Sequence, residues 1–160
     1  MKTAIIYASK HGTTEKVASR IVEKLTETNE IELFSLNKNP NPDISGFEMV
    51  ILGAPIYAGQ PVKKMKDFCK ANEFVLLQKK TGLFVCGMEP EKEKREKELK
   101  EAYPASLYQK AEVTGFLGGA FIFEQMNFFE RFIIKRISKI NRTVRRIDWD
   151  AIDAFVERLK

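Results

Sequence analysis

The chain has 160 residues, of which 44% are hydrophobic and 31% charged, and its formal net charge at pH 7 is +5. This composition is typical of one folded domain and excludes a disordered or low-complexity chain. Two cysteines and one histidine are too few for a disulfide framework or a Cys/His metal site. Because the N-terminal segment lacks the long apolar region of a signal peptide, and no stretch is long enough to span a membrane, we expect a cytoplasmic protein.

The first two thirds of the chain alternate between strand-like and helix-like patterns. Apolar or alternating runs predict strands at residues 2–8, 31–36, 47–52 and 82–86. Apolar residues at i, i+3, i+4 spacing predict helices at 14–25 and 61–71, and charged i, i+4 pairs predict a solvated helix at 91–102. Prolines mark the segment 37–45 as a loop. This alternation predicts parallel strands joined by crossover helices.

The last third predicts one more strand and two helices. A fifth strand is expected within 113–123, with a bend or bulge at Gly115 and at the pair Gly118-Gly119. An amphipathic helix over 124–140 and a closing helix over 148–159 follow, and residues 131–146 contain seven Arg or Lys residues and no acid. The sequence therefore predicts a single three-layer α/β domain, residues 1–160. Its doubly wound five-stranded parallel sheet has the order 2-1-3-4-5, and residues 124–146 form a basic helical insertion.

The most informative motif is the turn between the first strand and the first helix, Ser9-Lys10-His11-Gly12-Thr13-Thr14. The first N–H groups of a helix lack acceptors and the helix dipole is positive there, so such a turn binds anions. Gly12 allows close backbone approach, and the hydroxyls of Ser9, Thr13 and Thr14 add donors. The turn lacks both the GxxxxGK[ST] and the GxGxxG nucleotide motifs. It therefore favours a monophosphate, best matched by flavin mononucleotide (FMN); the alternative is an ordinary capped turn.

Two further loops are expected at the same edge of the sheet, because ligands bind there beyond the carboxyl ends of the strands. The loop 54–61 offers Tyr57, whose ring either stacks on a flat ligand or packs on its own loop. The loop 87–91 follows the strand that ends at Cys86. We interpret Cys86 and Cys69 as small buried apolar residues and Glu89 as an acid in the first turn of the next helix, with a proton relay near the flavin as the alternative for Glu89. No catalytic or metal-binding residue is assigned.

The strand-SxxGTT-helix pattern, the GAPIYAG segment at 53–59 and the CGMEP segment at 86–90 resemble a flavodoxin-type FMN domain over the whole chain. This resemblance implies that residues 9–14 hold the phosphate and that the isoalloxazine ring lies between the other two segments. The implied cofactor-binding residues are Ser9, Lys10, His11, Gly12, Thr13, Thr14, Pro55, Ile56, Tyr57, Ala58, Gly59, Cys86, Gly87, Met88 and Glu89. Flavodoxins usually have a hydroxyl residue in the place of His11. Because this chain has a histidine there, we expect the turn to gain partial positive charge as the pH falls.

A narrower resemblance covers residues 129–137 (FERFIIKRI) and 147–150 (IDWD), which are similar to the flavodoxin-like, menaquinone-dependent protoporphyrinogen oxidases. Those proteins add a basic amphipathic insertion to the FMN domain, lie at the inner membrane and pass electrons from the porphyrinogen to a quinone. Ordinary flavodoxins are instead acidic electron carriers. The oxidases tend to carry an arginine near the position of Tyr57, and this chain has none there.

Three functions follow from these patterns. The chain is a quinone-linked FMN oxidoreductase of the protoporphyrinogen-oxidase type, a flavodoxin-type electron carrier without its own substrate, or a binding module that has lost FMN. The phosphate-type turn argues against the third, and the basic insertion favours the first. The expected partners are an electron donor or acceptor protein or a quinone, and no nucleic acid. Residues 131–146 either contact an anionic membrane at the inner face of the cell membrane or form a solvated surface.

Overall fold

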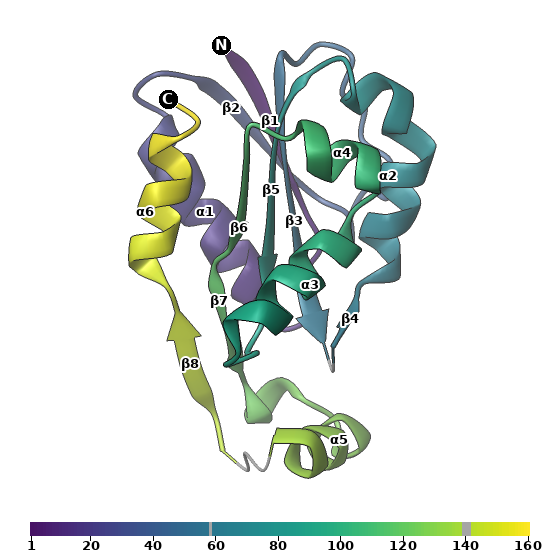
Figure 1. Cartoon of the computed structure of the whole chain (residues 1–160), viewed down its shortest axis with the longest axis vertical. Helices are drawn as coiled ribbons and strands as arrows, with labels where there is room; N and C mark the ends of the chain where they lie inside the picture. The colour runs from purple at the N-terminus through teal and green to yellow at the C-terminus, as the bar shows by residue number, and fades with distance from the viewer. Residues whose placement is uncertain (58, 139–141) are drawn as a thin grey trace.

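A computed structural model describes residues 1–57, 59–138 and 142–160. At its centre lies a sheet whose parallel strands follow the order β2-β1-β3-β5-β6 (Figure 1). These strands are β1 (Lys2–Tyr7), β2 (Glu30–Ser35), β3 (Met49–Tyr57), β5 (Lys80–Cys86) and β6 (Val113–Phe116). The short β4 (Gln60–Pro61) pairs antiparallel with the end of β3. The order of the parallel strands confirms the predicted doubly wound arrangement 2-1-3-4-5.

Helices cover both faces of the sheet and bury two separate apolar layers. The helices are α1 (Thr13–Leu25) and α6 (Trp149–Glu157) on one face, and α2 (Lys63–Leu76), α3 (Lys92–Ala102) and α4 (Ala105–Lys110) on the other (Figure 1). Successive side chains of a strand point to opposite faces. Ile5 of β1 therefore packs with α1 and α6, whereas the next residue, Ile6, packs with α2.

The structure differs from the predicted elements after the third parallel strand. Residues 53–57 continue β3 instead of forming a loop, and β4 pairs with its last residues, Tyr57 with Gln60 and Ile56 with Pro61. Pro61 therefore lies in a strand, and α2 begins at Lys63 instead of at the proline. Helix α4 was not predicted, because its six residues are too few to show a helical period.

The expected fifth strand is divided at the predicted bend. β6 ends at Phe116, and β7 (Gly118–Phe121) leaves the sheet to pair antiparallel with β8 (Val144–Ile147). Between them lie the 3-10 turn η1 (Phe123–Gln125) and α5 (Phe128–Ser138), so the helix predicted at 124–140 begins later, and its last two residues lie outside the described residues. We call residues 118–147 the β7–β8 excursion. Every helix in the described part of the chain is too short or too polar to serve as a transmembrane span.

Gly118 fixes the point where the excursion leaves the sheet. Its φ of 80° is rare for other residues, and a Cβ here would lie 2.2 Å from the Arg146 carbonyl oxygen. We therefore expect Gly118→Ala to lower the free energy of unfolding by about 2–4 kcal/mol in chemical denaturation. Gly46→Ala is the control, because a Cβ there meets nothing within 4 Å; its effect should stay below about 0.5 kcal/mol. Equal effects at the two positions would contradict the close contact between β7 and β8.

Candidate functional site

The turn between β1 and α1 opens the site at the carboxyl edge of the sheet. Gly12 immediately precedes α1 with a φ of 89°, a left-handed conformation that side chains disfavour. Its N–H donates to Ser9 Oγ at 3.0 Å, and Asn37 Nδ2 donates to the Ser9 carbonyl at 2.7 Å. Ser9 thus shapes the turn by accepting a hydrogen bond, in addition to its expected capacity to donate one to a ligand.

Other donors at this turn have no partner among the described residues. The N–H groups of Lys10, His11 and Thr13 make no hydrogen bond within the described part of the chain. The Thr14 hydroxyl is buried, and the described residues offer it no partner at normal geometry. Burying an unpaired hydroxyl is costly, so such a group points to a ligand or to strain. At the N-terminus of a helix, these donors suit an anion.

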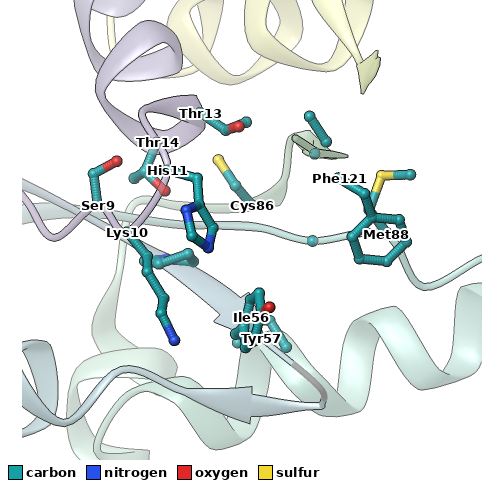
Figure 2. A pocket seen from close by; sticks show the side chains of 14 residues that line it. Ser9, Lys10, His11, Thr13, Thr14, Ile56, Tyr57, Cys86, Met88 and Phe121 are labelled. Atoms are coloured by element: carbon teal, nitrogen blue, oxygen red, sulfur yellow. The ribbon is translucent and has the colours of Figure 1, made fainter. Parts of the chain in front are cut away.

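The three predicted loops do meet, and they enclose a cavity together with β7 (Figure 2). The wall formed by β7 was not predicted. The lining residues are Ser9, Lys10, His11, Thr13, Thr14, Pro55, Ile56, Tyr57, Cys86, Gly87, Met88, Gly119, Ala120 and Phe121. The volume open to water-sized molecules is about 40 Å³, which is room for only a few waters.

Three of the expected site residues that the structure describes do not line this cavity. Gly12 is exposed beside it, and Gly59 lies in the β3–β4 turn with a φ of 76°. The Glu89 carboxylate accepts the Glu91 N–H at 3.1 Å. Because α3 begins only at Lys92, the interpretation of Glu89 as an acid in the first turn of that helix is wrong. Ala58 lies outside the described residues.

Cys86 ends β5 with its thiol in the wall of the cavity. Burial raises the pKa of the Cys86 thiol to about 12, against a weaker lowering by the neighbouring Thr14 hydroxyl. Burial likewise raises the pKa of the Cys69 thiol in α2 to about 12, with help from the charge of Glu73. Both thiols are therefore protonated at neutral pH, as expected for small buried apolar residues.

Close contact of Gly118 and Gly119 with Gly87 brings β7 to the cavity. The Gly87 N–H donates to the Gly118 carbonyl oxygen at 2.9 Å. A Cβ on Gly119 would lie 2.5 Å from the Gly87 carbonyl oxygen, so only a residue without a side chain fits there. This contact places Phe121 opposite the β1–α1 turn (Figure 2).

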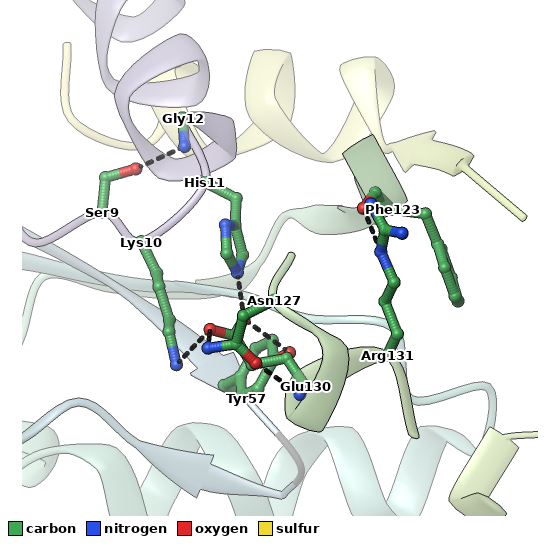
Figure 3. Close-up of polar contacts among 9 residues, drawn as sticks. All are labelled: Ser9, Lys10, His11, Gly12, Tyr57, Phe123, Asn127, Glu130 and Arg131. Carbon is green, nitrogen blue, oxygen red and sulfur yellow. Dashed lines mark hydrogen bonds and ion pairs between the residues drawn. The ribbon is translucent and has the colours of Figure 1, made fainter. Parts of the chain in front are cut away.

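One carboxylate of the excursion reaches the site from α5 (Figure 3). His11 Nε2 donates to Glu130 Oε2 at 2.8 Å, and the Tyr57 hydroxyl donates to the same oxygen at 3.0 Å. Lys10 Nζ lies 3.6 Å from Glu130 Oε1 and 4.3 Å from the centroid of the Tyr57 ring. Only 13% of the Glu130 side chain is exposed. We call these four residues the Glu130 cluster.

The Glu130 cluster carries a stable negative charge at its centre. Burial raises the pKa of Glu130, but the hydrogen bonds from Tyr57 and His11 and the charge of Lys10 outweigh it and hold the pKa below its usual value. Burial, followed by the hydrogen bond to Glu130 and its charge, raises the pKa of Tyr57 far above its usual value. At neutral pH, Glu130 is therefore ionised and Tyr57 is neutral.

Glu130 and its neighbour Asn127 were missed at the level of the sequence. The Glu130 N–H donates to Asn127 Oδ1 at 2.8 Å, and Asn127 Nδ2 donates to Glu130 Oε1 at 3.0 Å, so Asn127 caps α5. The pattern Asn-x-x-Glu at 127–130 is a capping signal that could have located the start of the helix. No local signal shows that Glu130 meets His11, 119 positions away.

These features define an open α/β protein with a monophosphate-type turn at the point where its strand order reverses. The family model described as a flavodoxin domain matches residues 4–147, and the chain therefore belongs to the flavodoxin-domain family. Flavodoxin domains bind FMN, in agreement with the cofactor predicted from the sequence.

Individual relatives are distant but cover nearly the whole chain. Protoporphyrinogen IX dehydrogenase [quinone] of Escherichia coli K12 is 19% identical over 99% of this chain and 94% of its own. A short-chain flavodoxin associated with a PDU bacterial microcompartment superposes with a TM-score of 0.61 at 16% identity, covering 99% of this chain and 96% of that one. A flavodoxin of Fusobacterium nucleatum bound to flavin mononucleotide gives 0.54 at 16% identity, with the same coverage. These structural likenesses confirm the fold.

Proposed function

We propose that the chain is an FMN-dependent oxidoreductase that passes electrons from a reduced donor to a quinone-type or protein acceptor. The observation that carries the proposal is the group of unpartnered donors at the β1–α1 turn, among them the buried Thr14 hydroxyl. A phosphate monoester accepts several such hydrogen bonds, so these donors fit the phosphate end of FMN. Membership of the flavodoxin-domain family supports the same cofactor.

Different segments around the cavity bind different parts of FMN in this proposal. Residues 9–14 bind the phosphate, and residues 55–59 and 86–89 flank the ring, joined by residues 119–121 of β7. When bound, FMN supplies the redox chemistry, because its ring accepts a hydride or single electrons. The protonated Cys86 thiol, Met88 and Phe121 give the ring side a largely apolar wall. The N-terminus of α1 gives the phosphate side a positive field, and the Lys10 ammonium lies over the Tyr57 ring.

Thr14→Val tests the phosphate role. The substitution keeps the shape but removes the hydroxyl, so we expect FMN to bind about tenfold more weakly. Without FMN the free energy of unfolding should stay equal or rise slightly, because an unpaired buried hydroxyl is lost. Quenching of flavin fluorescence measures affinity, and chemical denaturation measures stability.

The matched control is Thr3→Val, at the opposite end of β1. The Thr3 hydroxyl donates to Asn29 Oδ1 at 3.2 Å, so this variant should lose stability and keep its FMN affinity. If Thr14→Val binds FMN as tightly as the unaltered chain, Thr14 does not hold the phosphate.

We further propose a reaction of the protoporphyrinogen-oxidase type. Support comes from the E. coli relative, which aligns over 94% of its length, and from Arg145 of the β7–β8 excursion, which lines a hollow together with His11 and Thr13 of the β1–α1 turn. The chain lacks an arginine near Tyr57, but Lys10 Nζ lies 4.3 Å from the Tyr57 ring centroid. A cation therefore stands beside that ring, where an anionic substrate would need it.

A flavodoxin-type electron carrier is the alternative. The Glu130 cluster favours it, because the carboxylate pairs with Lys10 and reduces the positive charge left for an anionic substrate. The FMN-loaded protein, incubated with protoporphyrinogen and a menaquinone analogue, separates the two. We expect porphyrin formation about tenfold or more above that of free FMN at the same concentration, since the protein orients both reactants. A rate equal to that of free FMN would contradict the oxidase-type reaction and favour the electron carrier.

We also propose peripheral contact between the excursion and an anionic membrane, at the inner face of the cell membrane. Four large apolar side chains of α5, which we call the Phe face, are exposed: Phe128, Phe129, Phe132 and Ile137. The excursion is also basic, with no acid between residues 131 and 146. Helix α5 lies at the end of the molecule opposite both termini (Figure 1). Exposed aromatic residues beside Lys and Arg are typical of helices that lie in the membrane interface.

Cosedimentation with vesicles tests this contact. The double variant Phe128→Ser/Phe129→Ser removes side chains that are 86% and 68% exposed, so we expect binding to anionic vesicles to fall about tenfold. Phe74→Ser is the control, because Phe74 is 78% exposed on α2, away from the excursion. Added salt should weaken binding. Equal binding to neutral vesicles, or an equal loss in the control, would exclude the proposed contact.

A further inference from the structure

Glu130 pairs with the Lys10 and His11 side chains of the β1–α1 turn, beside the N–H groups that an anionic cofactor would use. We propose that Glu130 is an internal competitor for FMN: it holds α5 closed over the site and must leave when FMN binds. This inference rests on the proposed FMN function. It makes the position of the β7–β8 excursion depend on whether the cofactor is bound.

Charge is the first argument. Lys10 and His11 belong to the β1–α1 turn, and both contact the Glu130 carboxylate, at 3.6 Å and 2.8 Å. A phosphate at the same turn would be a second anion beside this carboxylate. Like charges that share one site repel strongly when they are largely shielded from water, and the Glu130 side chain is only 13% exposed. A phosphate at this turn and the Glu130 carboxylate would therefore repel each other and compete for the Lys10 and His11 side chains.

Space is the second argument. The cavity has about 40 Å³ open to water-sized molecules, so its walls lie close together where the ring of FMN is proposed to bind. Two side chains of its wall, His11 and Tyr57, are held by the Glu130 carboxylate, with their rings tilted and 5.8 Å apart (Figures 2 and 3). Release of Glu130 frees both side chains to move apart.

The attachment of α5 is the third argument. Among its described residues, only Ile134 is buried, and it packs with Phe123 and Met126 in a small cluster apart from the two main layers. Tyr57 and Phe121 are half-buried against that cluster. With so little apolar contact, the hydrogen bonds and ion pairs of Glu130 decide whether α5 stays on the site. For a ligand that binds only the open form, the apparent affinity is the affinity of the open form multiplied by the fraction of molecules that are open.

Glu130→Gln tests the competition, because glutamine keeps the size and removes the charge. We expect FMN to bind about tenfold more tightly than to the unaltered chain, as followed by quenching of flavin fluorescence. Glu124→Gln is the matched control. It removes the same charge from the same excursion, and the Glu124 carboxylate contacts Thr143 instead of the site. Its FMN affinity should not change.

Limited trypsin digestion gives a second, independent readout. Arg131, Lys135 and Arg136 are exposed cleavage sites on α5. We expect FMN to speed cleavage there in the unaltered chain, and Glu130→Gln to be cleaved fast even without FMN. Protection of these sites by FMN, or an affinity of Glu130→Gln equal to or weaker than that of the unaltered chain, overturns the competition and leaves the proposed function standing. If neither the unaltered chain nor any variant binds FMN, the proposed function fails and this inference fails with it.

Discussion

The position of β1 between β2 and β3 is the constraint on which the site depends. The crossover after β1 runs through α1 over one face of the sheet to β2, and the crossover after β3 runs through α2 over the other face to β5, so the loops after β1 and β3 part and leave a crevice between them. Alternating burial holds this order in place, because neighbouring residues of β1 enter different apolar layers. A shift of one residue in register would exchange the two layers. The order of the strands therefore determines where the site lies.

Within the crevice, the positive groups and the apolar groups lie on different walls. The turn before α1 presents N–H groups and a positive helix end, whereas the opposite walls hold a protonated thiol, Met88 and Phe121. Glu130 introduces the one strong negative charge that touches this turn in the described residues. Burial is the largest cause of the raised pKa of Tyr57, and the hydrogen bond that it shares with Glu130 adds to this shift while it lowers the pKa of Glu130.

Local patterns were enough to predict most of the fold. The apolar run ending at Tyr7, the helical spacing from Val17 to Leu25 and the turn between them predicted the first βα unit, and strand-helix alternation predicted the strand order. The prediction of a loop at the end of β3 was wrong: Pro55 and Gly59 are typical of loops, but residues 53–55 pair with β5 and residues 56–57 pair with β4, which makes this segment a strand. The Gly118-Gly119 pair predicted a bend, but not the direction in which the chain would leave the sheet.

The candidate site was predictable only in part, for a physical reason. Residues that lie together because strands end at one edge can be grouped from the sequence, and three of the four walls of the cavity were found in this way. The fourth wall depends on two glycine backbones in contact, Gly87 and Gly119, and the Glu130 cluster depends on the placement of a helix that buries almost nothing. Such contacts are set by tertiary packing and leave no period in the sequence.

The pairing of Gly118 with Ile147 has a consequence for the history of the fold. The two ends of the excursion are adjacent backbone partners, and the Asp148 N–H returns directly to the Leu117 carbonyl oxygen at 3.1 Å. A segment whose entrance and exit touch can be lengthened, shortened or exchanged at small entropic cost, without disturbing either apolar layer. The segment that covers the crevice can therefore change in length and sequence during evolution while the sheet stays the same.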